Sequence, residues 1–170
     1  MAVLAELALN LYCERGRSLK DHMDHLYSKY GFFCSQNGYY SMSKPLAAKA
    51  ILDRLRSGGT YQMLKELVGP DRSVVNIRDL GHPGFDSSKP DHKPTLPVSK
   101  SAPLLTIKLS SGCVIQLRPS GTEPKFKYYL EMQGTPGMQR EKVRGELEFV
   151  ECVLLERLLQ PSLNGLTKWQ

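Results

Sequence analysis

The sequence has 170 residues, of which 41% are hydrophobic and 24% are charged, a size and composition that allow one folded domain with an additional piece. It has no apolar run of the roughly 18 residues that a membrane-spanning helix needs, so we expect a cytoplasmic protein without membrane partner, signal peptide or anchor. Its four scattered cysteines give no zinc array, and its net charge of +6, which arises entirely after residue 30, favours anionic partners.

Two helices are predicted in the first thirty residues. The first helix is predicted over residues 2–15, which begin with an apolar run from Ala2 to Leu11 that Glu6 interrupts. Ser18 can cap the second helix, because Asp21 follows it three residues later in an arrangement close to a capping box. Gly31 is the residue type that ends a helix well.

Residues 32–59 are predicted to form a hairpin followed by a helix. Aromatic residues on both sides of Asn37-Gly38 favour a tight turn at that dipeptide. Ser43 would then cap a helix that has Pro45 in its first turn and Gly58-Gly59 at its end.

Four strands are predicted after this helix, at 73–80, 104–109, 113–117 and about 126–133. The segment between the first two is dense in Pro, Gly and Ser, so we expect an extended surface loop there. In the last strand the apolar side chains occupy alternate positions and so share one face of the sheet: they are Phe126, Tyr128, Leu130 and Met132.

The closing helix is predicted over 138–159 and carries one apolar stripe that would cover this face of the sheet. The stripe consists of Val143, Leu147, Val150, Leu154 and Leu158. A mostly antiparallel sheet covered by helices is an α+β fold.

The turn between the last two strands, RPSGTEPK at 118–125, concentrates hydrogen-bond donors suited to an anion. Arginine offers a planar fork for phosphate oxygens. Gly121 permits backbone conformations closed to other residues, so that several N–H groups can converge on one point. The side-chain donors are Arg118, Ser120, Thr122, Lys125 and Lys127. A plain polar hairpin loop explains the same residues, and residue types alone do not choose between the two readings.

Two further patterns have plain structural explanations. His22 and His25 lie three residues apart on a predicted helix, where a solvated polar face is the simpler reading and no third metal ligand is suggested, so no metal site is assigned. Aromatic residues near basic ones permit a nucleic-acid platform, but aromatics in strands usually pack the sheet. These aromatics are Phe32, Phe33, Tyr39, Tyr40, Tyr128 and Tyr129.

The segment RPSGTEPKFKYY closely resembles the phosphate-binding loop of the C-terminal domain of the α-D-phosphohexomutase superfamily. SLKDHMDHLYSKYGFF at 18–33 resembles the segment, a helix and then a strand, that leads into that domain. Residues 77–101 and LLQPSLNGL at 158–166 resemble the phosphopentomutase and glucose-1,6-bisphosphate synthase branch of the superfamily. Two departures stand out: LGHPGFD replaces a threonine-rich run, and Pro119 replaces a threonine.

The resemblance implies a TATA-binding-protein-like C-terminal domain over 31–170, preceded by a helical remnant of the third mutase domain over 1–30. It implies that Arg118, Ser120, Gly121 and Thr122 contact a substrate phosphate and that Lys127 adds an outer cation. Because the reacting serine and the metal loop of such enzymes have no counterpart here, it implies no catalytic residue and no metal ligand in this chain, although the complete enzymes would use Mg²⁺.

The resemblance therefore predicts the substrate-phosphate-binding part of a phosphoglucomutase or phosphopentomutase, catalytically incomplete alone and with the appearance of a fragment or short isoform. The expected partners are hexose or pentose phosphates, including glucose 1,6-bisphosphate. One alternative is a non-catalytic sugar-phosphate-binding or regulatory module. Another is a basic domain that binds nucleic acid, a partner we do not expect.

Overall fold

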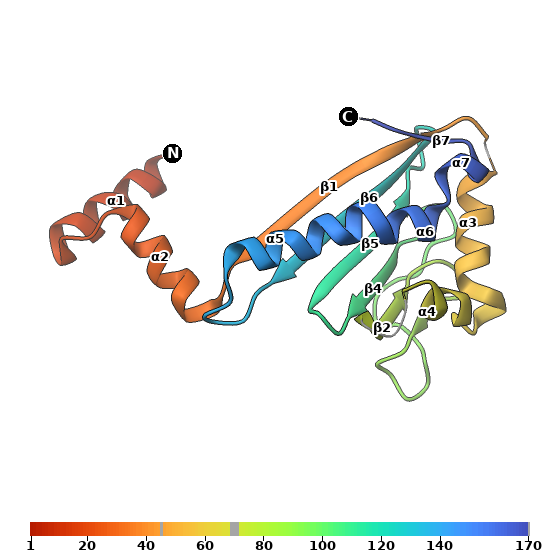
Figure 1. Ribbon diagram of the computed structural model, residues 1–170, viewed down its shortest axis with the longest axis horizontal. Helices are drawn as coiled ribbons and strands as arrows, with labels where there is room; N and C mark the ends of the chain where they lie inside the picture. Colours follow the sequence, from red (N-terminus) through yellow and green to blue (C-terminus); the bar gives the residue numbers. More distant parts are fainter. Residues whose placement is uncertain (45, 69–71, 170) are drawn as a thin grey trace.

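The first thirty residues form two helices, as the sequence predicts. In the computed structural model, which describes residues 1–44, 46–68 and 72–169, α1 spans Ala2–Arg15 and α2 spans Leu19–Tyr30. The hydroxyl of Ser18 accepts a hydrogen bond from the Asp21 N–H, and the Asp21 carboxylate accepts one from the Ser18 N–H at 2.9 Å, which completes the capping box. Both helices extend from one end of the sheet (Figure 1). The division of the chain at residue 30 stays a prediction.

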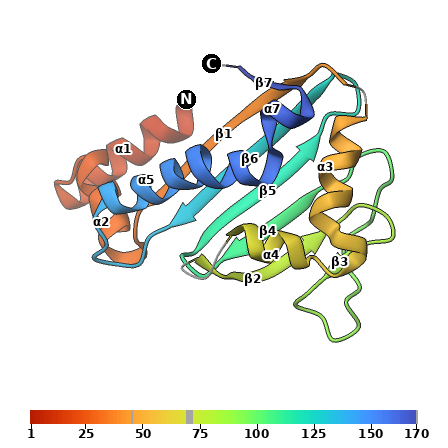
Figure 2. The ribbon, with the colours of Figure 1, turned by 45° about the vertical axis from the view of Figure 1, so that its right-hand side comes forward.

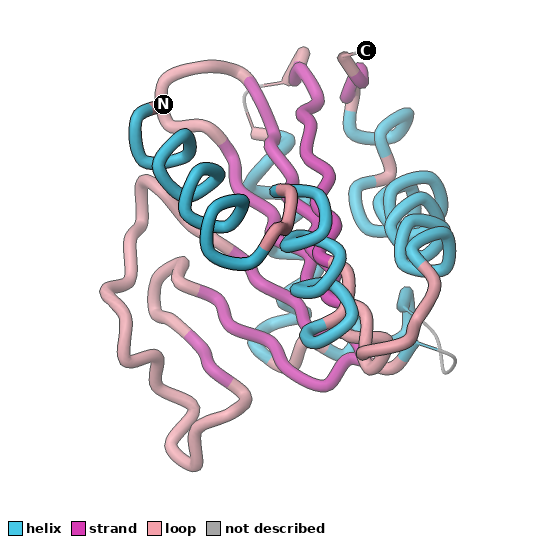
Figure 3. Tube along the Cα trace, turned by 90° about the vertical axis from the view of Figure 1, so that its left-hand side faces the viewer, coloured by secondary structure: helices cyan, strands magenta, loops and turns pink. Residues whose placement is uncertain are grey.

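A seven-stranded antiparallel sheet forms the centre of the molecule, in the order β3-β2-β4-β5-β6-β1-β7. The strands are β1 Phe33–Met42, β2 Val74–Asp79, β3 Phe85–Asp86, β4 Leu105–Leu109, β5 Cys113–Pro119, β6 Lys125–Gln133 and β7 Leu166–Lys168. The loop after β3 projects beyond the edge of the sheet that β3 forms (Figures 1 and 3). The four predicted strands and the extended loop are confirmed, except that the loop contributes the two-residue strand β3.

The predicted turn at Asn37-Gly38 is wrong, because β1 runs straight through it. Asn37 lies opposite Tyr129 and Gly38 opposite Tyr128 on β6. A Cβ atom at Gly38 would lie 2.4 Å from the Tyr128 hydroxyl oxygen. The glycine therefore makes room for a neighbouring ring, and pairing along ten residues of β1 outweighs the local preference of the dipeptide for a turn.

Helices cover one face of the sheet, as Figure 2 shows. They are α3 Ala47–Arg56, α4 Gln62–Val68, α5 Arg140–Phe149, α6 Leu155–Leu159 and α7 Pro161–Asn164, with a π-helical turn at Val150–Leu154 between α5 and α6. The predicted cap at Ser43 is wrong, since α3 begins after Leu46 and the Ser43 hydroxyl instead donates to the Gly165 carbonyl at 2.9 Å. Pro45 lies outside the described residues.

The core lies between these helices and the sheet. From β4, β5 and β6, the buried side chains include Ile107, Ile115, Leu117, Phe126 and Leu130. The apolar stripe predicted for the closing helix is buried at all five positions. This confirms the α+β class with a mostly antiparallel sheet and leaves the opposite side of the sheet, here called the open face, free of α3 to α7.

A partly buried polar network lies at the edge of the core, where the π-helical turn meets the sheet. The Glu151 carboxylate accepts hydrogen bonds from the Tyr128 hydroxyl at 2.5 Å, from Lys168 Nζ at 2.8 Å and from the Gln36 amide. Burial raises the pKa of the Tyr128 hydroxyl, and the neighbouring Glu151 raises it further. The network links β1, β6 and β7 to the covering helix, so Glu151 holds the last strand in place.

Candidate functional site

The donor-rich turn predicted from the sequence joins β5 to β6. Arg118 stands near the end of β5 and Lys127 near the start of β6, and the two are direct cross-strand partners. The Ser120 N–H donates to the Lys125 carbonyl at 2.8 Å, which closes the turn. Residues 118–127 are called the anion cup below.

Arg118 and Lys127 both point to the open face. Side chains alternate between the two faces of a strand, and Leu117, Phe126 and Tyr128 are buried in the core. Arg118 is exposed, as are Gly121 and Thr122 of the turn, whereas Ser120 and Lys127 are partly buried. The structure thus brings all five predicted residues together at one end of the sheet.

The donors of the anion cup are unpaired. Within the part of the chain that the structure describes, no group forms a hydrogen bond with the guanidinium of Arg118, the hydroxyls of Ser120 and Thr122 or the ammonium of Lys127, and no acceptor meets the N–H groups of residues 121–123. Glu123 pairs instead with Lys125, at 3.2 Å. The cup therefore presents several free donors to one region of solvent, which suits an anion.

One part of the sequence reasoning about the cup is wrong. Gly121 does not adopt the left-handed conformation that would require glycine, because its φ is not among the positive values of the chain. A Cβ atom there would meet only the Ser101 carbonyl oxygen, at 3.7 Å, an ordinary contact. A glycine here leaves space beside the backbone of the turn, which suits the close approach of a ligand oxygen.

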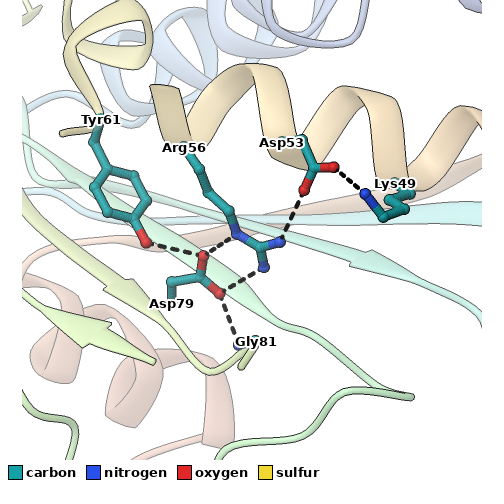
Figure 4. Close-up of polar contacts among 6 residues, drawn as sticks. All are labelled: Lys49, Asp53, Arg56, Tyr61, Asp79 and Gly81. Atoms are coloured by element: carbon teal, nitrogen blue, oxygen red, sulfur yellow. Dashed lines mark hydrogen bonds and ion pairs between the residues drawn. The ribbon is translucent and has the colours of Figure 1, made fainter. Parts of the chain in front are cut away.

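A buried ion pair beside the anion cup was not predicted (Figure 4). The Asp79 side chain is 1% exposed and accepts hydrogen bonds from Arg56 Nε at 2.6 Å and Nη2 at 3.1 Å. It also accepts from the Tyr61 hydroxyl at 3.0 Å and the Gly81 N–H at 2.7 Å. The Asp79 hydrogen bonds raise the pKa of Arg56, and burial, reinforced by Asp79, raises the pKa of Tyr61. No motif in the sequence joins these residues, which come from α3, the start of α4 and the end of β2.

The ion pair supports the wall of a cavity of about 480 Å³ next to the cup. Its lining includes Lys49, Arg56, His82, Lys100 and Pro119. Ser101 lines the same cavity and also faces Gly121. The cup therefore lies at the edge of a hollow that could accept a ligand larger than a bare phosphate.

The aromatic residues do not form one nucleic-acid platform, and the possible metal ligands do not form a cluster among the described residues. Tyr40 and Tyr128 belong to the core, with ring centroids 6.0 Å apart, and Phe32 stacks on Tyr27 at 4.7 Å, so the six aromatics do not form one platform. Over residues 1–44, 46–68 and 72–169, no three His, Cys, Asp or Glu side chains are placed to hold a metal ion. No helix in those ranges is long and apolar enough to cross a membrane.

Comparison with known proteins gives consistent relatives, although no protein-family model matches the chain. The chain is 38% identical over 165 residues to glucose 1,6-bisphosphate synthase of Homo sapiens. This alignment covers 96% of the chain and 26% of the human protein. The chain is 32% identical over 165 residues to phosphopentomutase of Homo sapiens, with the same two coverages of 96% and 26%. The chain thus spans about a quarter of the length of these curated relatives.

A solved structure shares the fold. The crystal structure of the exocytosis-sensitive phosphoprotein pp63/parafusin, a phosphoglucomutase from Paramecium in its open form, superposes with a TM-score of 0.60 at 15% identity. The match covers 96% of this chain and 27% of the Paramecium protein. It shows that the sheet and its covering helices form an arrangement already known from a larger protein.

Proposed function

The chain belongs to the phosphohexomutase family, where it is homologous to the C-terminal quarter of glucose 1,6-bisphosphate synthases and phosphopentomutases, and on that basis we propose that its anion cup binds the phosphate group of a phosphorylated sugar. The ligands are hexose or pentose phosphates and their bisphosphates. The contacts come from Arg118, Ser120, Thr122 and the backbone at Gly121, with Lys127 as an outer cation.

The observation that carries this proposal is the set of unpaired donors in the cup. Ser and Thr in a loop that only connects two strands commonly bond to nearby backbone groups. Here Ser120 and Thr122 have no such partner among the described residues, and the acidic side chain of Glu123 neutralises Lys125 and leaves Arg118 free. Charged donors of this kind make short, strong hydrogen bonds to phosphate oxygens.

The donor set also fits the reaction that the resemblance implies. A mutase that moves a phosphoryl group between two positions of a sugar holds the non-reacting phosphate while the other reacts. Guanidinium, hydroxyl and backbone N–H donors recognise phosphate without reading the sugar, so one cup serves both orientations of a bisphosphate. Within this role the residues of the chain bind and orient the substrate, and none makes or breaks a bond.

Arg118→Ala should weaken the binding of glucose 1,6-bisphosphate by about 1.5–3 kcal/mol, or roughly 10- to 150-fold in Kd, because a charged hydrogen bond is lost. Isothermal titration calorimetry with the purified chain measures this. Arg17→Ala, which removes an exposed arginine from the loop between α1 and α2, is the matched control and should leave Kd unchanged. Equal affinity in the two variants would show that the turn is only a hairpin.

The purified 170-residue chain should show no mutase turnover on its own. A coupled assay with glucose 1-phosphate, a bisphosphate primer and Mg²⁺ measures the conversion. The expectation follows from the described residues, which supply phosphate donors and, as stated above, no metal-holding cluster. The Mg²⁺ that the resemblance implies for complete enzymes thus has no fitting ligands here, and we assign this chain no step that uses it. Turnover well above a blank would overturn a purely binding role.

A further inference from the structure

Three neighbouring strands and the residue that follows β7 place a row of two cations and two aromatic rings on the open face. Arg118 of β5 lies opposite Lys127 of β6, and Lys127 lies opposite Tyr39 of β1. The pairing of β1 with β7 matches Tyr40 with Lys168, so the next position brings Tyr39 beside Trp169. The backbone N–H of Trp169 donates to the Tyr39 carbonyl at 3.3 Å.

The side chains of Tyr39 and Trp169 share the face that carries the cations. Tyr40 is buried in the core and Lys168 reaches Glu151 on the helix side, so their neighbours Tyr39 and Trp169 take the opposite face. The two rings stack with centroids 6.1 Å apart and planes inclined by 26°. Trp169 is 62% exposed, which leaves an aromatic surface open to a ligand.

The aromatic pair lies next to the anion cup, because Tyr39 is the cross-strand partner of Lys127. Lys125 Nζ, which Glu123 binds inside the cup, also lies 4.6 Å from the centre of the Tyr39 ring. Because neighbouring strands are roughly 5 Å apart, a phosphate held at Arg118 and Lys127 would have the rings about one to two strand spacings away. That distance suits a ring covalently attached to the phosphate.

Amide side chains stand one row further along the same face. Gln116, Tyr129 and Asn37 are successive cross-strand partners on β5, β6 and β1. Amides donate and accept hydrogen bonds and so match the hydroxyl groups of a sugar. The open face thus offers charge for a phosphate, an aromatic surface for a ring and amides for hydroxyls, in adjacent positions.

We propose that Tyr39 and Trp169 form an aromatic shelf against which the sugar ring of a phosphorylated sugar packs while the anion cup holds its phosphate. The C–H groups on one face of a pyranose or furanose ring would meet the electron-rich face of the indole. The inference rests on the proposed function, because the phosphate in the cup is what brings the ring to the shelf. It adds sugar-contacting residues beside an anion cup whose own donors recognise phosphate.

The single tryptophan of the chain makes the shelf measurable. Glucose 1,6-bisphosphate should change the fluorescence of Trp169, whereas inorganic pyrophosphate, which has no ring, should bind the cup and leave the fluorescence nearly unchanged. In calorimetry, Trp169→Leu should weaken the binding of glucose 1,6-bisphosphate about three- to tenfold. The same substitution should change pyrophosphate binding by less than about 1.5-fold.

Tyr12→Leu is the control, because Tyr12 is 70% exposed on α1, well away from the row. If pyrophosphate and the bisphosphate both bind, but Trp169 stays silent and Trp169→Leu binds both as the parent does, the shelf is wrong and the phosphate cup stands. If neither ligand binds, the result contradicts both the proposed function and the aromatic shelf that rests on it. Tighter binding and stronger quenching by an oligothymidylate than by glucose 1,6-bisphosphate would overturn the sugar assignment.

Discussion

Asp79→Ala should lower the free energy of unfolding by about 3–5 kcal/mol, the cost of breaking a buried ion pair by removing one partner. Asp79 is almost fully buried and accepts four hydrogen bonds. Without it, the Tyr61 hydroxyl and the Gly81 N–H lose their acceptor, and the Arg56 guanidinium keeps only its longer pair with Asp53. The hydroxyl and the N–H then pay for their desolvation without the compensating bond.

Urea unfolding followed by circular dichroism measures the effect, and Asp53→Ala provides the matched control. Asp53 also pairs with Arg56, at 3.6 Å, but its side chain is 48% exposed, so its loss should cost about 1 kcal/mol or less. A loss below about 1 kcal/mol for Asp79→Ala would mean that solvent replaces the carboxylate and that the pair does not support the wall of the cavity.

Glu151→Ala should cost about 1–3 kcal/mol of stability, because it leaves the buried Tyr128 hydroxyl without an acceptor. The loss of the pair with Lys168, whose side chain is 41% exposed, adds little. The loss of stability should concentrate at the end of the chain, since Lys168 ties β7 to the covering helix. Hydrogen exchange, measured in the variant and in the parent chain, should therefore be accelerated by the substitution more in β7 than in β5. Uniform acceleration across both strands would contradict a local role for Glu151.

The same carboxylate predicts a pH dependence. Burial by itself raises the pKa of Glu151, but hydrogen bonds from Lys168, Tyr128 and Gln36, with the charge of Lys168, outweigh burial and hold its pKa below the ordinary value. The folded state thus binds the proton less well than the unfolded state, so this stabilisation is present above the unfolded pKa of about 4.3 and is lost as the pH falls through the lower folded pKa. The stability difference between the parent chain and Glu151→Gln should be largest near neutral pH and shrink below about pH 4.

Local rules predicted the elements whose signals were local. The capping box at Ser18 needs only residues three positions apart, and the alternation from Phe126 to Met132 needs only one strand with one buried face. The capping box and the alternation could both be predicted from the sequence, because residues close together along the chain determine them.

Features that depend on distant partners were missed or misread. Asn37-Gly38 is a turn by local preference and a strand because β6 lies beside it. The three residues of β7 are too few to show an alternation, so Trp169 gave no sign of its place beside Tyr39. Asp79 meets Arg56 across 23 positions of sequence, a pairing that only the folded chain reveals.

The anion cup shows the same division. The residue types at Arg118, Ser120 and Thr122 suggested anion binding and left a plain hairpin equally open. The absence of local partners among the described residues, a property of the fold, favours the proposed anion binding. The role of Gly121 was misread because a glycine can serve either by its φ or by its missing side chain, and the sequence does not say which.

The two outermost strands, β3 and β7, have two and three residues, whereas β1 and β6 in the interior have ten and nine. An edge strand presents unpaired N–H and C=O groups that can recruit the edge of another molecule, and a very short edge offers too few of them to do so stably. The short β3 and β7 are therefore poor templates for edge-to-edge aggregation. β7 pairs with Tyr40, Ser41 and Met42 at one end of β1, so it protects that end of the long strand, and Lys168 ties it to the partly buried carboxylate of Glu151.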